Sequence, residues 1–110
     1  MNNSKSLTTE ETFNLAVKNH QEGKTDIAQK LYLQVLRIKP NHSQAHNNLG
    51  VIFNQLREFK KAKDCFEKAI AINPSYVDAH NNLGNIFKEL GEHQKAIGCY
   101  EQAIEINPNY

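Results

Sequence analysis

The hexapeptide AHNNLG occurs twice in this chain of 110 residues, at 45–50 and again at 79–84, 34 residues later. The similarity extends well beyond those six residues. Aligned without a gap, residues 43–76 and 77–110 are identical at 20 of 34 positions. Internal similarity with a period of this size is typical of proteins in which small structural units stack in a row. The period therefore constrains the fold more than composition does.

The 34-residue period predicts three units and a short leading segment. Moving back one period from the second unit gives a more divergent first unit at 9–42, which keeps seven of the second unit's residues. The second and third units are residues 43–76 and 77–110. Residues 1–8 are polar and are expected to form a flexible tail. No solvating helix follows the third unit, so we expect the chain to be the N-terminal part of a longer array.

Each unit is predicted to consist of two amphipathic helices. Small and apolar residues recur at every third or fourth position, as in Leu49, Phe53 and Leu56, and this helical period breaks once in the middle of the unit. No stretch alternates with a period of two, so strands are not expected. The predicted helices are 9–22, 25–38, 43–56, 59–72, 77–90 and 93–106.

Signals for helix ends agree with these boundaries. Thr8 and Ser75 each precede an acidic residue by three positions, a pattern typical of capping boxes at helix starts. Gly23 and Gly91 lie at the same place in their units and suit the turn between paired helices. Proline lacks an amide donor and restricts the residue before it, so it ends a helix. The prolines after the second helices are Pro40, Pro74 and Pro108.

Composition and charge exclude several classes of function. The formal net charge is +1, which gives no electrostatic reason to expect a nucleic acid as partner. No apolar run has the length of a membrane span, and the polar N-terminus does not look like a secretion signal. We therefore expect no membrane association and a cytoplasmic location, where Cys65 and Cys99 stay reduced. Their equivalent places on adjacent units predict a separation of about 10 Å, too far for a disulfide.

Signatures of catalysis and metal binding are missing. The chain has no nucleophile elbow and no phosphate-binding loop. His42 and His46 are one helical turn apart, but no third ligand accompanies them. His46 and His80 repeat with the period, which favours a packing role. We expect no metal, no cofactor and no enzymatic activity from this chain by itself.

The spacing of small and bulky residues resembles that of the tetratricopeptide repeat. The residues that carry the resemblance in the second unit are His46, Leu49, Gly50, Phe53, Ala62, Phe66 and Pro74. Gly50 and Ala62 are small and are expected to leave room for the paired helices to approach closely. The family usually has tryptophan where His46 stands, and the first unit departs from the pattern at Thr12, Ala16 and Asn19. The resemblance implies an all-α fold in which three helix-turn-helix repeats stack as a right-handed superhelical solenoid. It also implies that the first helices line a concave surface.

Asparagines recur on the predicted first helices at intervals of 34 residues, at Asn14, Asn48 and Asn82. Amide side chains both donate and accept, so such a ladder can pair with the backbone of an extended peptide. The full set expected on the concave face is Asn14, Gln44, Asn47, Asn48, Asn54, Gln55, Asn81, Asn82, Asn85 and Lys88. The ladder resembles that of the tetratricopeptide arm of O-linked N-acetylglucosamine transferases. The alternative is that these asparagines serve packing between repeats.

These features predict a protein-protein interaction module that binds an extended peptide or a partner protein in its concave groove. One alternative is the substrate-presenting arm of a larger glycosyltransferase or sulfotransferase. Tetratricopeptide domains that clamp the C-terminal carboxylate of chaperones use a set of Lys, Asn, Asn, Lys and Arg, and only Asn48 matches that set here. The corresponding residues are Phe13, Val17, Asn48, Asp78 and Asn82.

A second alternative function is self-assembly. The first unit has Glu11, Asn19 and Glu22 where inner units are apolar, so it resembles a polar cap. The third unit has no cap, and we expect an exposed apolar face at that end and a homo-oligomer that forms through it. The residues expected on this face are Leu83, Phe87, Ile97, Tyr100, Ala103 and Ile104.

Overall fold

The computed structural model describes residues 6–109, so most of the predicted tail at 1–8 lies outside the described residues, as does Tyr110. Helices account for the regular structure of the described part, which contains no strand. Three of the predicted helices end one residue earlier than expected, and the others match. The helices are α1 (Thr9–Gln21), α2 (Thr25–Ile38), α3 (Ser43–Gln55), α4 (Phe59–Ile72), α5 (Val77–Glu89) and α6 (His93–Ile106).

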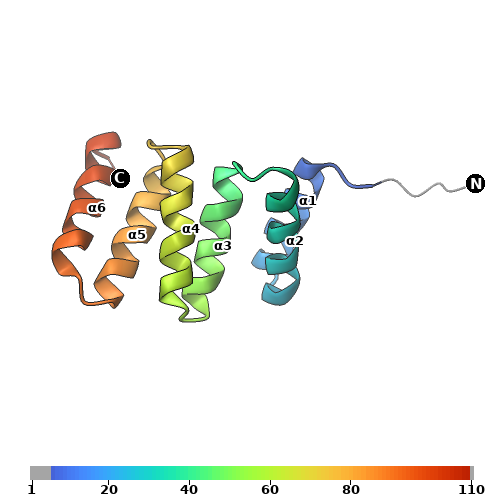
Figure 1. The fold of residues 1–110 in the computed structure, drawn as a ribbon, viewed down its shortest axis with the longest axis horizontal. Coiled ribbons are helices and arrows are strands. Elements are labelled where there is room, and N and C mark those ends of the chain that lie inside the picture. The colour runs from blue at the N-terminus through green and yellow to red at the C-terminus, as the bar shows by residue number, and fades with distance from the viewer. Residues whose placement is uncertain (1–5, 110) are drawn as a thin grey trace, which may run out of the picture.

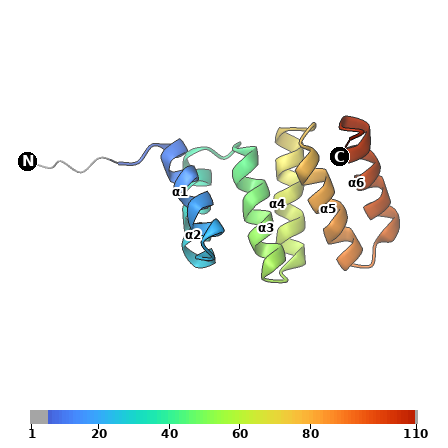
Figure 2. The ribbon, with the colours of Figure 1, turned by 180° about the vertical axis from the view of Figure 1, so that it is seen from behind.

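The six helices form three antiparallel pairs that follow one another in a row (Figures 1 and 2). Contacts join α1 with α2, α3 with α4, and α5 with α6. Further contacts join the second helix of each pair to the first helix of the next pair, α2 to α3 and α4 to α5, and α3 also contacts α5. The stack is elongated, with principal extents of 59 × 26 × 22 Å. The predicted all-α fold of three stacked helix-turn-helix units is confirmed, and the handedness of the superhelix stays a prediction.

Close approach of the two helices in a pair depends on a glycine in the first helix. A Cβ atom added to Gly50 would lie 2.6 Å from the ring of Phe66, and one added to Gly84 would lie 2.7 Å from the ring of Tyr100. The rings therefore lie directly against the backbone of α3 and α5. Real contacts of carbon atoms are about 3.5–4.0 Å, so a side chain at either glycine would require the ring or the helix to shift. This is the role that the sequence predicted for Gly50. The first pair has Ala16 at the equivalent place.

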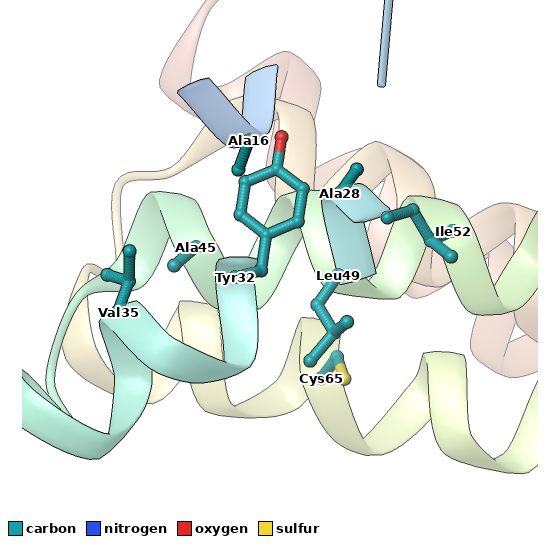
Figure 3. Close-up of a cluster of buried hydrophobic side chains, with 8 residues drawn as sticks. All are labelled: Ala16, Ala28, Tyr32, Val35, Ala45, Leu49, Ile52 and Cys65. Carbon is teal, nitrogen blue, oxygen red and sulfur yellow. The ribbon is translucent and has the colours of Figure 1, made fainter. Parts of the chain in front are cut away.

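The buried core is shared between neighbouring pairs. One cluster of buried side chains, drawn in Figure 3, joins the first pair to the second. Its members are Ala16, Ala28, Tyr32, Val35, Ala45, Leu49, Ile52 and Cys65. A second cluster joins the second pair to the third, and consists of Ala62, Phe66, Leu83, Ile86, Phe87 and Ala96. Since the first helix of each later pair contributes to the core of the preceding one, the pairs depend on their neighbours for burial.

In each of the two later pairs, one histidine is hydrogen-bonded to the proline that precedes the pair. The Nε2 atom of His46 donates to the carbonyl oxygen of Pro40 at 2.8 Å, and that of His80 donates to Pro74 at 2.8 Å. Both rings are buried, with 9% and 8% of their surface exposed. The predicted packing role of these histidines is confirmed. His42 is also engaged, because its Nδ1 atom accepts from the backbone amide of Ala45 at the start of α3.

The turns inside the pairs require a left-handed backbone conformation. Gly23 and Gly91 have φ values of 79° and 80°, as their position in the sequence predicted. The equivalent residue of the second unit is Arg57, whose φ is 60°. Its guanidinium group lies 5.1 Å from the centre of the Phe59 ring. An L-residue with a side chain is strained in this conformation by about 1–2 kcal/mol, so the second turn carries a cost that the other two avoid.

The two predicted capping boxes have different outcomes. At the start of α1 the Thr8 hydroxyl accepts from the Glu11 amide, and the Glu11 carboxylate accepts from the Thr8 amide, as expected. The prediction for Ser75 is wrong. The residue at the N-cap of α5 is Tyr76, and no side chain makes a capping hydrogen bond there. The Ser75 amide instead donates to the Asn73 side chain in the preceding turn.

We expect Arg57→Gly to raise the free energy of unfolding by about 0.5–1 kcal/mol, because glycine adopts this φ without steric cost. This gain already allows for the loss of the exposed contact between the Arg57 guanidinium and the Phe59 ring. Chemical denaturation measures the free energy of unfolding. Gly91→Ala is the matched control. It should lower the free energy of unfolding by about 1 kcal/mol, because alanine is strained at a positive φ. Loss of stability in Arg57→Gly would show that the stacking on Phe59 outweighs the backbone strain.

Candidate functional site

The first helices of the three pairs place the asparagine ladder on one side of the stack. Asn14 on α1, Asn48 on α3 and Asn82 on α5 occupy equivalent positions because the units repeat without insertions. Asn14 is exposed, while Asn48 and Asn82 are half-buried. We call the surface that carries these three side chains the first-helix face. On this face the same polar residue recurs at the same position of successive units.

A chain of amide hydrogen bonds runs through this face. Asn82 donates through Nδ2 to Oδ1 of Asn47 at 3.1 Å, and Asn47 donates to Oδ1 of Asn48 at 3.4 Å. Asn48 in turn donates to the hydroxyl oxygen of Tyr32 at 3.3 Å. The chain therefore links α5 through α3 to α2. Asn47 is buried at its centre, with 5% of its surface exposed.

The three ladder asparagines therefore differ in how many of their amide donors and acceptors are available to a ligand. Asn14 is exposed and has no hydrogen-bond partner within residues 6–109, so its donors and acceptor are available to a ligand. Asn48 and Asn82 each use one of two N–H groups inside the protein. The packing role that was the alternative for these asparagines thus applies to Asn48 and Asn82, and it leaves part of their hydrogen-bonding capacity unused.

Most of the remaining predicted residues also lie on helices of the first-helix face. Gln44, Asn85 and Lys88 are exposed, and Asn54 and Asn81 are half-buried. Two of the predicted amides are engaged in contacts with other elements. Asn85 accepts a short hydrogen bond from the Tyr100 hydroxyl of α6. Gln55 is hydrogen-bonded through Oε1 to His20 Nε2 at 3.0 Å, which ties α3 to α1.

A hollow of about 450 Å³ at the N-terminal end of the face brings Asn14 and Gln44 together. It is also lined by Thr9, Glu10, Phe13, Lys39 and His42, which the sequence did not single out as ligand-binding residues. The His42 ring stacks on that of Phe13 at 4.7 Å between centroids. Burial, with the nearby Lys39 ammonium, lowers the pKa of His42, which agrees with the neutral ring that its capping hydrogen bond requires. The clue in the sequence was the place of His42 at a helix start.

The opposite end of the stack exposes apolar side chains. Ile97 and Ile104 of α6 are 48% and 55% exposed, and Tyr100 is half-buried although its equivalents Tyr32 and Phe66 are fully buried. We call the surface formed by Ile97, Tyr100 and Ile104 the C-terminal face. In the two earlier pairs the corresponding surface is covered by the first helix of the next pair.

Three residues predicted for this exposed face are not exposed. Leu83 and Phe87 keep only 7% of their surface, and Ala103 keeps 1%. Leu83 and Phe87 lie on the side of α5 that packs against Phe66 and Ala62 of the preceding pair. For Leu83 and Phe87 the prediction was wrong because a first helix turns its apolar side toward the pair before it, and the following pair meets mainly the second helix. For Ala103 it was wrong because this residue of α6 is already buried without a following pair.

Neither cysteine forms a disulfide, as predicted, and both are free thiols. Burial raises the pKa of Cys65 to about 11, so this thiol is protonated at neutral pH. No cluster of three or more metal-ligating side chains occurs in the described part of the chain. None of the helices in that part combines the length and apolar character needed to cross a membrane.

Known proteins resemble this chain in sequence and in fold. The model of the tetratricopeptide repeat family matches residues 43–76 and 77–110. An uncharacterized protein, ycf37 of Pyropia yezoensis, is 38% identical over 48 residues, which are 44% of this chain. The chain spans only about a quarter of that protein's length, 27%. None of these sequence matches indicates a catalytic family.

Solved structures with the same fold have low sequence identity. The first tetratricopeptide domain of Spaghetti (RPAP3), bound to the HSP90 peptide SRMEEVD, superposes with a TM-score of 0.89 at 24% identity. That alignment covers 93% of this chain and 81% of the other. A crystal structure of MamA superposes with a TM-score of 0.87 at 20% identity over 93% of this chain and 60% of the other.

The family match covers well over half of the chain, and the stacked helix pairs have the architecture of solved tetratricopeptide structures. Its first unit, which the family model does not match, contributes a helix pair of the same form. Domains of this kind typically mediate protein interactions. The chain belongs to the tetratricopeptide repeat family.

Proposed function

We propose that the first-helix face binds an extended segment of a partner protein through its backbone. The observation that carries this proposal is the unused amide capacity of Asn14, Asn48 and Asn82, which repeats at a fixed register along three helices. An amide can donate to a peptide carbonyl and accept from a peptide N–H, so it recognises backbone whatever the side chains are.

The mode of binding differs from that of a carboxylate clamp. The Spaghetti (RPAP3) domain of the same fold holds an HSP90 peptide. At the places where a clamp has basic residues, this chain has Phe13 and Asp78, and Val17 stands where a clamp has asparagine. The clamp's own basic positions therefore supply no cation for a carboxylate, and the Asp78 side chain would repel it. The ligand is therefore an internal segment of a chain, held along its length.

The same face would serve the alternative function of presenting a substrate polypeptide to a transferase domain. Binding at the ladder is common to both functions, since an arm of that kind must also hold an extended chain. The two functions differ only in whether a catalytic domain is joined to the array.

A second candidate function, self-association, is favoured by the C-terminal face. Ile97 and Ile104 lie on the same side of α6, two helical turns apart, and both are about half exposed. Contiguous exposed apolar surface is uncommon on monomeric proteins and usually marks a contact. A second copy of the chain that covers this surface would bury both side chains.

For the peptide-binding proposal we expect Asn14→Ala to weaken the binding of library-selected extended peptides without lowering the melting temperature. Asn14 has no internal hydrogen bond, and each amide bond lost to a neutral ligand is worth about 0.5–1.5 kcal/mol. Asn48→Ala with Asn82→Ala should weaken binding and also lower the melting temperature, because both side chains bond within the protein. Calorimetry and thermal denaturation are the measurements.

Gln94→Ala, which removes an exposed amide from the second helix of the third pair, is the matched control and should leave both quantities unchanged. Peptide affinity that survives all three asparagine changes would contradict binding at the ladder. Selected peptides that share only a free C-terminal acid would contradict recognition of an internal segment.

For the self-association proposal we expect sedimentation velocity to show an assembly that grows with concentration and that is lost in Ile97→Ser with Ile104→Ser. Tyr100 is left unchanged because its ring packs against Gly84 inside its own pair. Ile27→Ser removes an equally exposed isoleucine from α2 and is the control. A strict monomer at high concentration would exclude this candidate.

A further inference from the structure

A hollow of about 500 Å³ lies between the second and third helix pairs, beside a glycine in the middle of α6. Its walls are α4 and α6, and its floor is α5, which lies between them along the row of helices (Figures 1 and 2). None of its lining residues belongs to the first-helix face or to the C-terminal face. All of them lie within residues 63–102, so the hollow is complete inside the described part of the chain.

We infer that this hollow binds an aromatic side chain of a partner protein, in a segment where acidic residues stand next to the aromatic one. The ring would lie on the backbone of α6 at Gly98, and a neighbouring carboxylate would pair with the ammonium of Lys63. The hollow is a second site, so the inference does not rest on binding at the first-helix face.

Packing within the chain does not require a glycine at position 98. A Cβ atom added to Gly98 would have no neighbouring heavy atom within 4 Å outside its own stretch of helix, and its φ is not positive. The equivalent residues of the first two units are Lys30 and Asp64. Glycine inside a helix makes that helix less stable than alanine would. The absence of a side chain therefore leaves the hollow open and does nothing for the stability of α6.

The other two glycines inside helices each carry an aromatic ring. A Cβ atom added to Gly50 would lie 2.6 Å from the Phe66 ring, and one added to Gly84 would lie 2.7 Å from the Tyr100 ring. In this fold a helical glycine thus offers a flat stretch of backbone on which an aromatic ring packs. No side chain of residues 6–109 takes that place at Gly98, so the ring would come from the partner.

The inside of the hollow suits an aromatic ring because it is apolar. Leu83 and Phe87 on its floor are each 7% exposed, and Ile70 of α4 and Cys99 of α6 are half-buried at its sides. Burial, with the nearby Glu67 carboxylate, raises the pKa of the Cys99 thiol, so this side chain is uncharged at neutral pH. A free cysteine of this kind packs as a small apolar residue.

The equivalent place in the first junction is more closed. Cys65, the counterpart of Cys99, is only 9% exposed and belongs to the core cluster of that junction. An aspartate, Asp64, stands there in place of Gly98. The open hollow is therefore a property of the second junction and is not repeated with the 34-residue period.

The charges around the hollow favour a carboxylate in the ligand. The ammonium groups of Lys63 and Lys95 lie 5.9 Å and 5.6 Å from the centre of the Phe87 ring. Lys95 is paired with Glu92 at 3.5 Å, whereas the half-buried Lys63 forms no ion pair within residues 6–109. Glu67 is the one carboxylate among the lining residues, so two lysines and one glutamate leave a net charge of +1. Lys63 is the cation that an acidic neighbour of the bound ring would meet.

The test uses three fluorescent peptides: GSDEFDEGS, GSDEADEGS without the ring, and GSNQFNQGS without the acids. Fluorescence anisotropy with the whole chain should give a dissociation constant at least about tenfold lower for GSDEFDEGS than for either control peptide. Lys63→Gln should weaken the binding of GSDEFDEGS about threefold or more and leave that of GSNQFNQGS unchanged. Lys30→Gln removes an exposed cation from α2 and is the matched control, which should change neither.

Gly98→Ala separates a binding role of the glycine from a structural one. The added methyl group meets nothing in the free chain, so the melting temperature should rise by about 4 °C. The same methyl group would hold the ring off the backbone of α6, so the binding of GSDEFDEGS should weaken about fivefold or more. Unchanged affinity would overturn the inference, and a fall in the melting temperature would show that packing requires the glycine.

Two further measurements locate the peptide. Backbone amide shifts should change most at residues 63–70 and 95–102, and bound peptide should slow the labelling of Cys99 by a maleimide. Asn14→Ala should leave the binding of GSDEFDEGS unchanged, which keeps this result independent of the first-helix face. Equal binding of the three peptides, shifts centred on α1 and α3, or no shift at saturating concentrations of peptide would each overturn the inference.

Discussion

The packing of each first helix onto the pair before it is the interaction on which the rest of the structure depends. Ala45, Leu49 and Ile52 complete the core of the first pair, and Leu83, Ile86 and Phe87 of α5 complete that of the second. A pair of helices this short buries too little surface to be stable alone. The contact also sets the register between successive first helices, and so it fixes the spacing at which the ladder asparagines stand.

That register explains why one set of amides can serve two purposes. Asn47 is buried between α3 and α5 and keeps the neighbouring asparagines in place, while Asn14, beyond the end of the network, has its amide in solvent. A buried amide that lost its partner would destabilise the junction by about 1–3 kcal/mol. The network therefore stabilises the stack and orients the remaining donors and acceptors of the first-helix face.

Much of this architecture could be predicted from the sequence because the constraints are local and periodic. Gly50 indicated close helix packing, and Pro74 indicated a helix end. The side to which Leu83 and Phe87 turn could not be predicted, since a helical period identifies an apolar stripe without saying which neighbour covers it. The hollow beside His42 and the left-handed Arg57 were missed for a related reason. The hollow depends on how segments from two helices meet, which no single residue type signals. The left-handed Arg57 was signalled only indirectly, by the glycines that stand at its place in the other two units.

The amide chain from Asn82 through Asn47 and Asn48 to Tyr32 has a direction, because each side chain donates to the next and accepts from the one before. Turning one amide over would set donor against donor, so all of them would have to turn together. The remaining donor and acceptor atoms of Asn82 and Asn48 are consequently held in one order from α5 to α3. A polypeptide backbone also has a direction, and the two ways of laying it along this row are not equivalent in energy.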